Sequence, residues 1–157
     1  MKTIAALSSL LLLAATSVSA APVVERQTQA PTEMDIAAFS ANTEPHGTGA
    51  FISFNITIPN TMSTTCAYSD HTSVSILPSV SLRPCNDPAV EWEFRQDPSL
   101  PGSDGRYRVV ITYAYDGEKK VAGYHEWPAS DFPLEDFGSV FETFYRGQPN
   151  FTITNLS

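Results

Sequence analysis

The chain contains few of the residues on which enzyme and metal chemistry most often depends. Among 157 residues there are two cysteines, three histidines and nine lysines or arginines. No HxH, HExxH or CxxC spacing is present, and neither phosphate-loop pattern nor a GxSxG nucleophile turn occurs. We therefore expect no catalytic residues, no metal site and no cofactor, and we expect that the protein is not an enzyme.

Positive charge is also scarce. The seventeen acidic residues outnumber the basic ones, the isoelectric point is about 4.7, and only Lys119 and Lys120 are adjacent basic residues. Phosphate groups are bound by clustered lysines and arginines, so nucleic acid is not an expected partner. No long hydrophobic run follows residue 20, and we expect no membrane association once the first segment is removed.

The N-terminus has the pattern of a secretory signal peptide. Lys2 is followed by an apolar run from Ile4 to Ala15 and then by small residues that end at Ala20. We expect cleavage after Ala20, which makes the protein secreted and extracellular, with a net charge of −9. Residues 21–33 predict a flexible leader, in which Arg26 is a candidate processing site, and residues 34–157 predict one domain.

The two cysteines and three glycosylation motifs are consistent with the secretory pathway. Cys66 and Cys85 are an even pair in an oxidising compartment, so we expect one structural disulfide. Asn55, Asn150 and Asn155 each begin an Asn-X-Ser/Thr motif. Asn55 and Asn150 are the predicted glycosylation sites, because Asn155 lies two residues from the C-terminus.

Alternation of apolar and polar residues predicts β-strands over most of the domain. Residues 51–58 place four apolar side chains on one face and Asn55 on the other. The same period recurs over 91–95, 106–115 and 121–127, with a turn at Asp116-Gly117, and more weakly over 34–39. The sequence predicts an all-β fold, a small antiparallel β-sandwich or β-barrel with one disulfide, and leaves the choice between them open.

The C-terminal part is less regular. Residues 141–145 and 151–154 are expected to pair with each other around Gly147-Gln148-Pro149. Residues 134–145 could instead form a turn or two of helix, since Leu134, Phe137 and Phe141 have roughly helical spacing, although Gly138 weakens that interpretation.

Three groups of side chains are candidates for functional sites. Glu91 and Glu93 would lie on one strand face, as a glycoside hydrolase requires, but such alternation is common on any exposed strand. The histidines have no metal-binding spacing. Tyr115, Tyr124 and Trp127 flank the predicted turn at Asp116-Gly117 and form a candidate binding surface, although most tyrosines near them are expected in the core.

The order of motifs resembles the fungal small secreted proteins similar to the major Alternaria allergen. The resemblance covers residues 34–127, and the residues that carry it are Asp35 to Ala41, the strand from Phe51 to Ile58 with Pro59-Asn60, Cys66, Pro84 to Pro88, Trp92 to Phe94, and the long strand before Gly123. It implies a secreted fungal β-barrel or sandwich that is effector-like or allergen-like and supplies no catalytic residues. The family's founding member has further cysteines, one of which joins two protomers, and this chain lacks them, so we expect a monomer.

Two hypotheses of function remain. The first is a secreted, non-enzymatic interaction protein that acts through its surface on a host or extracellular protein. The alternative is an extracellular carbohydrate-binding module that stacks sugars on exposed tyrosine or tryptophan, and three or more exposed aromatic side chains in one plane would favour it. A hydrolase would instead require a carboxylate pair in a concave pocket.

Overall fold

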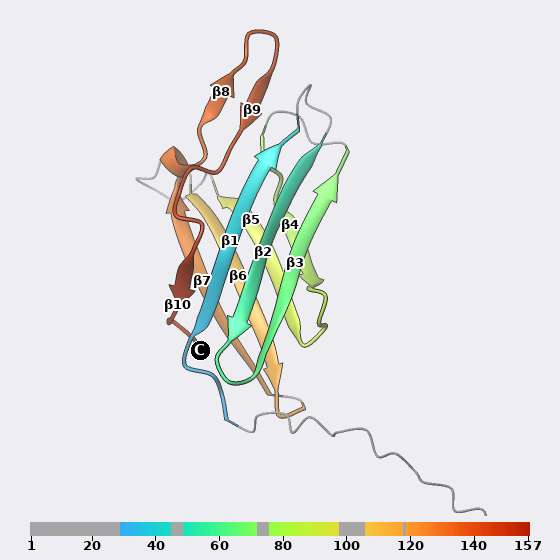
Figure 1. The fold of residues 1–157 in the computed structure, drawn as a ribbon, viewed down its shortest axis with the longest axis vertical. Coiled ribbons are helices and arrows are strands. Elements are labelled where there is room, and N and C mark those ends of the chain that lie inside the picture. Colours follow the sequence, from blue (N-terminus) through green and yellow to red (C-terminus); the bar gives the residue numbers. More distant parts are fainter. Residues whose placement is uncertain (1–28, 45–48, 72–75, 98–105, 118) are drawn as a thin grey trace, which may run out of the picture.

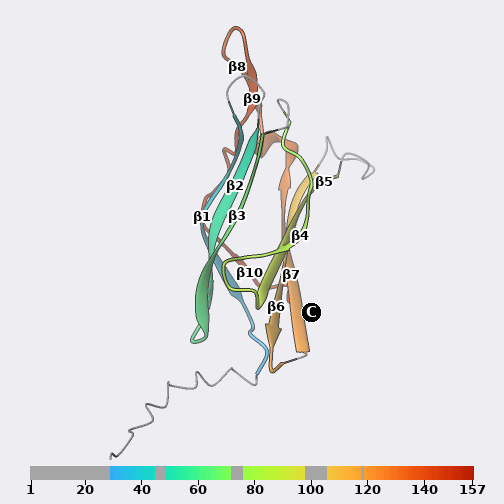
Figure 2. The same cartoon turned by 90° about the vertical axis from the view of Figure 1, so that its right-hand side faces the viewer.

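The computed structural model describes residues 29–44, 49–71, 76–97, 106–117 and 119–157, and these form an all-β fold. Two four-stranded antiparallel sheets lie face to face, as Figures 1 and 2 show from two directions. Sheet A has the order β10 (Phe151–Ile153), β1 (Met34–Thr43), β2 (Ala50–Ile58) and β3 (Met62–Asp70). Sheet B has the order β4 (Val80–Pro84), β5 (Val90–Asp97), β6 (Arg106–Tyr115) and β7 (Lys119–Pro128). A 3-10 turn, η1 (Ala129–Asp131), leads into a separate hairpin of β8 (Leu134–Asp136) and β9 (Phe141–Thr143).

The strands with the strongest predicted alternation bury the predicted faces. On β2 the four apolar side chains point inward, and Ser53, Asn55 and Thr57 point outward. The same prediction is confirmed on β5, where Trp92 and Phe94 are buried, and on β6. Phe54 from sheet A meets Trp92 from sheet B edge-on, with 5.2 Å between the ring centroids. The two inner faces therefore share one core, as in an aligned β-sandwich.

The two edges of the sandwich are joined in different ways. The predicted disulfide is confirmed: Cys66 on β3 is bonded to Cys85, which follows β4. Beside it the Asn86 N–H donates to the Thr65 carbonyl at 2.9 Å. At the other edge the segment after β10 runs from sheet A to sheet B. There Ser157 and Ala122 of β7 exchange two backbone hydrogen bonds of 2.9 Å. The fold is therefore a β-sandwich whose two sheets are linked at both edges.

A bulge in β1 brings the segment before β10 against the sheet. The register of β1 against β2 shifts between Ala37 and Ser40, and Ala38 has a positive φ of 55°. The Ala38 N–H donates to the Asn150 side chain at 2.9 Å, and the Phe39 N–H donates to the Pro149 carbonyl at 2.8 Å. These bonds satisfy the backbone groups that the bulge removes from the ladder.

The C-terminal predictions were wrong in two respects. β9 pairs with β8, and β10 pairs with β1, so residues 141–145 and 151–154 are not partners. Residues 134–145 form the β8–β9 hairpin rather than a helical turn. The helical spacing of Leu134, Phe137 and Phe141 does not mark a buried face, because all three side chains are exposed.

The predicted signal peptide and most of the predicted leader, residues 1–28, lie outside the described residues. Within the described part, β1 begins at Met34, where the domain was predicted to start. No helix among the described residues is long and apolar enough to cross a membrane.

Candidate interaction surface

The β8–β9 hairpin projects beyond the end of the sandwich (Figure 1). Its two strands pair from Leu134 with Thr143 to Asp136 with Phe141. The turn is closed by the Phe137 N–H, which donates to the Val140 carbonyl at 2.9 Å. Gly138 has a φ of +88°, a conformation that favours glycine, and its N–H donates to the Asp136 carboxylate at 2.7 Å. The tip therefore has a defined backbone conformation.

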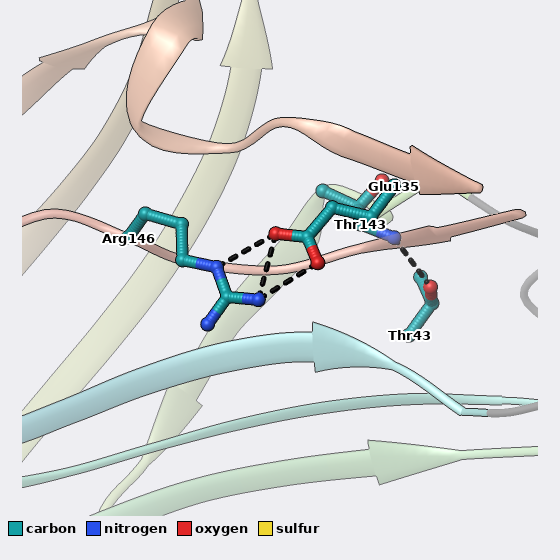
Figure 3. Close-up of polar contacts among 4 residues, drawn as sticks. All are labelled: Thr43, Glu135, Thr143 and Arg146. Carbon is teal, nitrogen blue, oxygen red and sulfur yellow. Dashed lines mark hydrogen bonds and ion pairs between the residues drawn. The ribbon is translucent and has the colours of Figure 1, made fainter. Parts of the chain in front are cut away.

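The base of the hairpin is fastened to sheet A. In Figure 3 the Thr143 N–H points at the Thr43 hydroxyl oxygen, 2.9 Å away, and both threonines are buried. The Tyr145 N–H donates to the Ala41 carbonyl at 2.8 Å. The Arg146 guanidinium holds Glu135 in a two-point contact, with N–O distances of 2.7 and 2.8 Å. Such forked pairs fix orientation as well as distance.

An aromatic cluster anchors the residues on either side of the hairpin. Phe132, just before β8, and Tyr145, just after β9, lie with their ring centroids 5.1 Å apart. Tyr145 also contacts Phe39 edge-on at 4.8 Å and Trp127 at 5.6 Å. Burial of the ring raises the pKa of the Tyr145 hydroxyl, whose O–H donates to the Gln148 carbonyl at 2.7 Å. The hairpin therefore extends from the best-packed part of the core.

The side chains of the hairpin are apolar and exposed. Leu134, Phe137 and Phe141 are 53%, 57% and 50% exposed. Phe137 leans edge-on against Phe144, at 5.9 Å between ring centroids, and the Arg146 guanidinium covers Phe144 at 5.1 Å. Large apolar side chains gathered on a projection are unusual on a protein surface and are typical of binding sites.

The charges beside these side chains are mostly negative. Glu135, Asp136 and Glu142 lie on the two strands, and Arg146, already paired with Glu135, is the one basic residue between 134 and 146. Asp136 is exposed at the turn, whereas Glu142 is 6% exposed. The tip is therefore an apolar surface with an acidic border at Asp136, since Glu135 is paired and Glu142 is buried.

The predicted surface of Tyr115, Tyr124 and Trp127 is not a surface. Trp127 is 4% exposed and lies in the core, so the prediction was wrong for this residue. Tyr115 is half-buried, and Tyr124 alone is exposed, with the Arg108 guanidinium over its ring at 5.0 Å. Tyr124 and Trp127 are three residues apart on one strand, so they point to opposite faces. No three exposed aromatic side chains share one face of the described residues.

Glu91 and Glu93 point outward from β5, as predicted. Each carboxylate has its own cation: Lys120 lies 2.9 Å from Glu91, and Arg95 lies 2.7 Å from Glu93. Only Glu93 lines a hollow, a shallow depression of about 390 Å³ between β4 and β5 in which Leu82 is exposed. The two glutamates therefore do not face each other across a pocket.

The remaining sequence candidates are dispersed. No three histidine, cysteine or acidic side chains lie close enough to hold a metal ion within the described ranges. His46 lies outside those ranges, His71 is exposed, and His125 lies flat on Phe151 with 4.2 Å between ring centroids. Asn55, Asn150 and Asn155 are all exposed, and their glycosylation stays a prediction.

Sequence reasoning missed the hairpin, although one signal was present. Asp136-Phe137-Gly138-Ser139 places a turn-forming aspartate and a glycine between two short apolar segments, which is typical of a hairpin turn. Three-residue strands are too short for their alternation to be read from sequence. In comparisons with known proteins, no family model and no curated protein matches this chain.

Proposed function

We propose that this protein is a secreted, non-enzymatic interaction protein that binds a partner protein through the tip of the β8–β9 hairpin. The observation that carries the proposal is the projection of Leu134, Phe137 and Phe141 from a base that is held by hydrogen bonds, an ion pair and aromatic packing. The effector-like or allergen-like role belongs to the same proposal and rests on the resemblance described above.

The rigid base favours binding by lowering its entropic cost. A loop that must be ordered on association loses conformational freedom, and this loss subtracts from affinity. Here the turn and the base are already fixed by the Phe137–Val140 and Thr143–Thr43 hydrogen bonds. Buried aromatic anchors dominate binding energy at many interfaces, and two exposed phenylalanines at a fixed tip suit that role.

The acidic border indicates the kind of partner. The exposed Asp136 would flank an inserted Phe137, whereas Glu135 is already paired with Arg146, so the fitting partner is a protein with an apolar cleft and a lysine or arginine at its border. A second copy of the same hairpin would place like charges together, and an anionic membrane surface would repel a chain of this net charge. Both are therefore weaker candidates than a basic cleft.

The absence of enzymatic activity is part of the proposal and has indirect support. Each carboxylate of the candidate pair is matched by its own cation on an outward strand face. A general acid works in a water-poor cleft, and both glutamates lie instead on an outward strand face.

The test is a matched pair of surface variants. The mature protein is used to capture partners from a host extracellular extract, and the affinity of each purified partner is then measured by calorimetry. We expect F137S/F141S to weaken binding at least about tenfold, which is the scale of hot-spot residues. L82S removes an equally exposed apolar side chain from β4 and is the control.

Two outcomes would contradict the proposal. One is a partner whose affinity falls with L82S and not with F137S/F141S. The other is binding to a defined polysaccharide and to no protein, with loss of that binding in Y124A, which would favour the carbohydrate-binding alternative. Thermal unfolding of each variant separates lost binding from lost folding.

A further inference from the structure

The outer face of sheet A is mostly polar and almost free of charge. Its outward side chains come from all four strands, and Asp35 is the one charged residue among them within the described part of the chain; the others are Ala37, Ser40, Asn42, Phe51, Ser53, Asn55, Thr57, Ser63, Thr65, Ala67, Ser69 and Thr152. Asp35 itself accepts a hydrogen bond of 2.7 Å from the Thr152 hydroxyl. Apart from Phe51, which lies towards one end of β2, hydroxyl groups and small side chains therefore make up most of this face.

Asn55, the first residue of a glycosylation motif, lies at the centre of the face. Its neighbours across the sheet are Ala37 on β1 and Thr65 on β3, and its neighbours along β2 are Ser53 and Thr57. All four are small, so the space above Asn55 is bordered by methyl and hydroxyl groups rather than by long side chains. A sugar ring has the matching combination of C–H and O–H groups.

The hydrogen bond that holds Asn55 is compatible with glycosylation. The Thr65 hydroxyl donates to the Asn55 Oδ1 at 2.8 Å. Glycosylation uses the other atom, Nδ2, which forms a bond to the anomeric carbon of a lipid-diphosphate-linked oligosaccharide. In that step Nδ2 loses one proton and the lipid diphosphate leaves, under catalysis by the transferase of the secretory pathway. The oxygen keeps its partner.

The other two motifs have different surroundings. The Asn150 Oδ1 accepts the Ala38 N–H in the β1 bulge, and Thr152 of that motif is bonded to Asp35. Asn155 accepts the Tyr124 N–H, and Ser157 of its motif pairs with β7 through its backbone. Both motifs therefore take part in closing the fold, whereas the motif at Asn55 lies in the middle of an open sheet face.

We propose that Asn55 carries an N-linked glycan and that its first sugars lie over the outer face of sheet A. The glycan then covers the one broad uncharged face of the sandwich and leaves the β8–β9 tip, which lies beyond the end of the sheets, accessible. It also shields part of the edge strand β3, whose unpaired backbone groups could otherwise pair with another chain. The inference needs the proposed export of the chain and does not depend on what the hairpin binds.

The first experiment measures occupancy with two variants of one residue. The full chain, with its own predicted signal peptide, is secreted from a yeast host. The glycan is then released by an amidase in H₂¹⁸O, which converts a glycosylated asparagine into ¹⁸O-labelled aspartate. We expect label at position 55 in the wild type and in T57S, which keeps the motif. T57A destroys the motif, and we expect it to lose the label at 55 and the mass of one glycan.

Failure of export and failure of the inference are distinguishable. If the native signal peptide does not direct secretion, the chain is produced with a signal peptide of the host, and glycan occupancy at Asn55 is measured on that product. An unlabelled Asn55 in secreted, folded wild-type protein would overturn the inference, whatever the state of Asn150. Cooperative unfolding of T57A, with at most the small loss expected from breaking the Thr57–Ser63 hydrogen bond, would show that lost label is not lost folding.

The second measurement tests where the glycan lies. We expect nuclear Overhauser contacts between the N-acetyl methyl group of the first sugar and the methyl groups of Ala37, Thr57 or Thr65. A glycan at Asn55 without any such contact would overturn the statement that the sugars lie over the sheet. Trimming to the first sugar should keep these contacts, because that sugar is the one bordered by the small side chains.

Discussion

The two sheets share an inner face but differ on their outer faces. Sheet A is covered by serine, threonine and alanine with Asn55 at its centre. Sheet B is crossed by ion pairs: Lys120 with Glu91, Arg95 with Glu93, and Arg108 with Glu126. The charged side chains of sheet B have partners of opposite charge on the same face, whereas the described outer side chains of sheet A are joined by hydroxyl hydrogen bonds, of which the Thr152–Asp35 bond is the one that involves a charged group. The difference suggests that sheet B faces water and that sheet A accommodates a neutral, hydroxyl-rich cover.

The largest expected effect is a loss of stability when the core shared by the two sheets is disrupted. Phe54 from sheet A and Trp92 from sheet B are both fully buried and touch each other. We expect F54A and W92A each to lower the unfolding free energy by about 3–5 kcal/mol, as for other buried aromatic truncations. Urea unfolding measures this loss, and outward S53A on β2 is the control with an expected change within about 0.5 kcal/mol.

The double variant sharpens this prediction. Because the two rings share a contact and would leave a shared cavity, we expect F54A/W92A to cost less than the two single losses together. Fully additive losses would contradict a common core, and would indicate that each sheet packs against something else.

How much of this arrangement the sequence predicts depends on the kind of strand. β2, β5 and β6 carry large apolar residues at every second position, so both their existence and their inward faces could be predicted. β3 is an edge strand whose inner side is mostly only half-buried, and β4 has five residues and ends at Pro84, so neither has a clear apolar period. The glycosylation motif at Asn55 is a three-residue pattern, and the disulfide follows from an even number of cysteines in a chain expected to be exported, so both could be identified from the sequence.

The candidate site was less predictable, for a physical reason. The base of the hairpin is held against sheet A by the Thr143–Thr43 hydrogen bond, which joins residues one hundred positions apart, and by the Tyr145–Ala41 backbone hydrogen bond. Such long-range contacts leave no period in the sequence. The exposed Leu134, Phe137 and Phe141 therefore resembled buried residues of a helix, and only the three-dimensional arrangement distinguishes the two interpretations.

A smaller effect, the salt dependence of the stability loss, should distinguish the outer face of sheet B from that of sheet A. Arg108 and Glu126 form an ion pair across β6 and β7, in which two guanidinium nitrogens donate to one carboxylate oxygen, and both side chains are partly exposed. We expect E126Q to lower the unfolding free energy by roughly 0.5–1 kcal/mol at low salt and by less at 1 M salt, because salt screens such pairs. Urea unfolding at the two salt concentrations measures the difference.

The matched variant on sheet A breaks a neutral contact. The Thr57 and Ser63 hydroxyls are 2.9 Å apart on the outer face, and S63A removes this hydrogen bond. We expect a small loss that is the same at both salt concentrations, since no charge is involved. A salt-dependent loss in S63A, or none in E126Q, would remove the electrostatic distinction between the faces.

The smallest expected effect is a pH dependence that comes from the inner side of the charged sheet. His125 is the neighbour of Glu126 but points the other way, where its ring stacks on Phe151 and meets Trp127 edge-on at 4.7 Å. Burial lowers the pKa of His125 below its ordinary value of 6.5, and the nearby Asp131 and Glu126 carboxylates oppose this shift only in part. The folded state therefore binds the proton less readily than the unfolded chain.

The sign of the effect follows from this order of proton affinities. Above pH 6.5 the imidazole is neutral in both states and its contribution to stability is complete; as the pH falls below 6.5, the unfolded chain binds the proton first and the folded state loses stability. We expect the unfolding free energy of the wild type to fall between pH 7.5 and 5.5, and H125F to flatten that slope. H71Q, which removes an exposed histidine, is the control. D131N should steepen it, because a carboxylate that favours the charged form of His125 is lost, and a flatter slope in D131N would show that desolvation does not control this group.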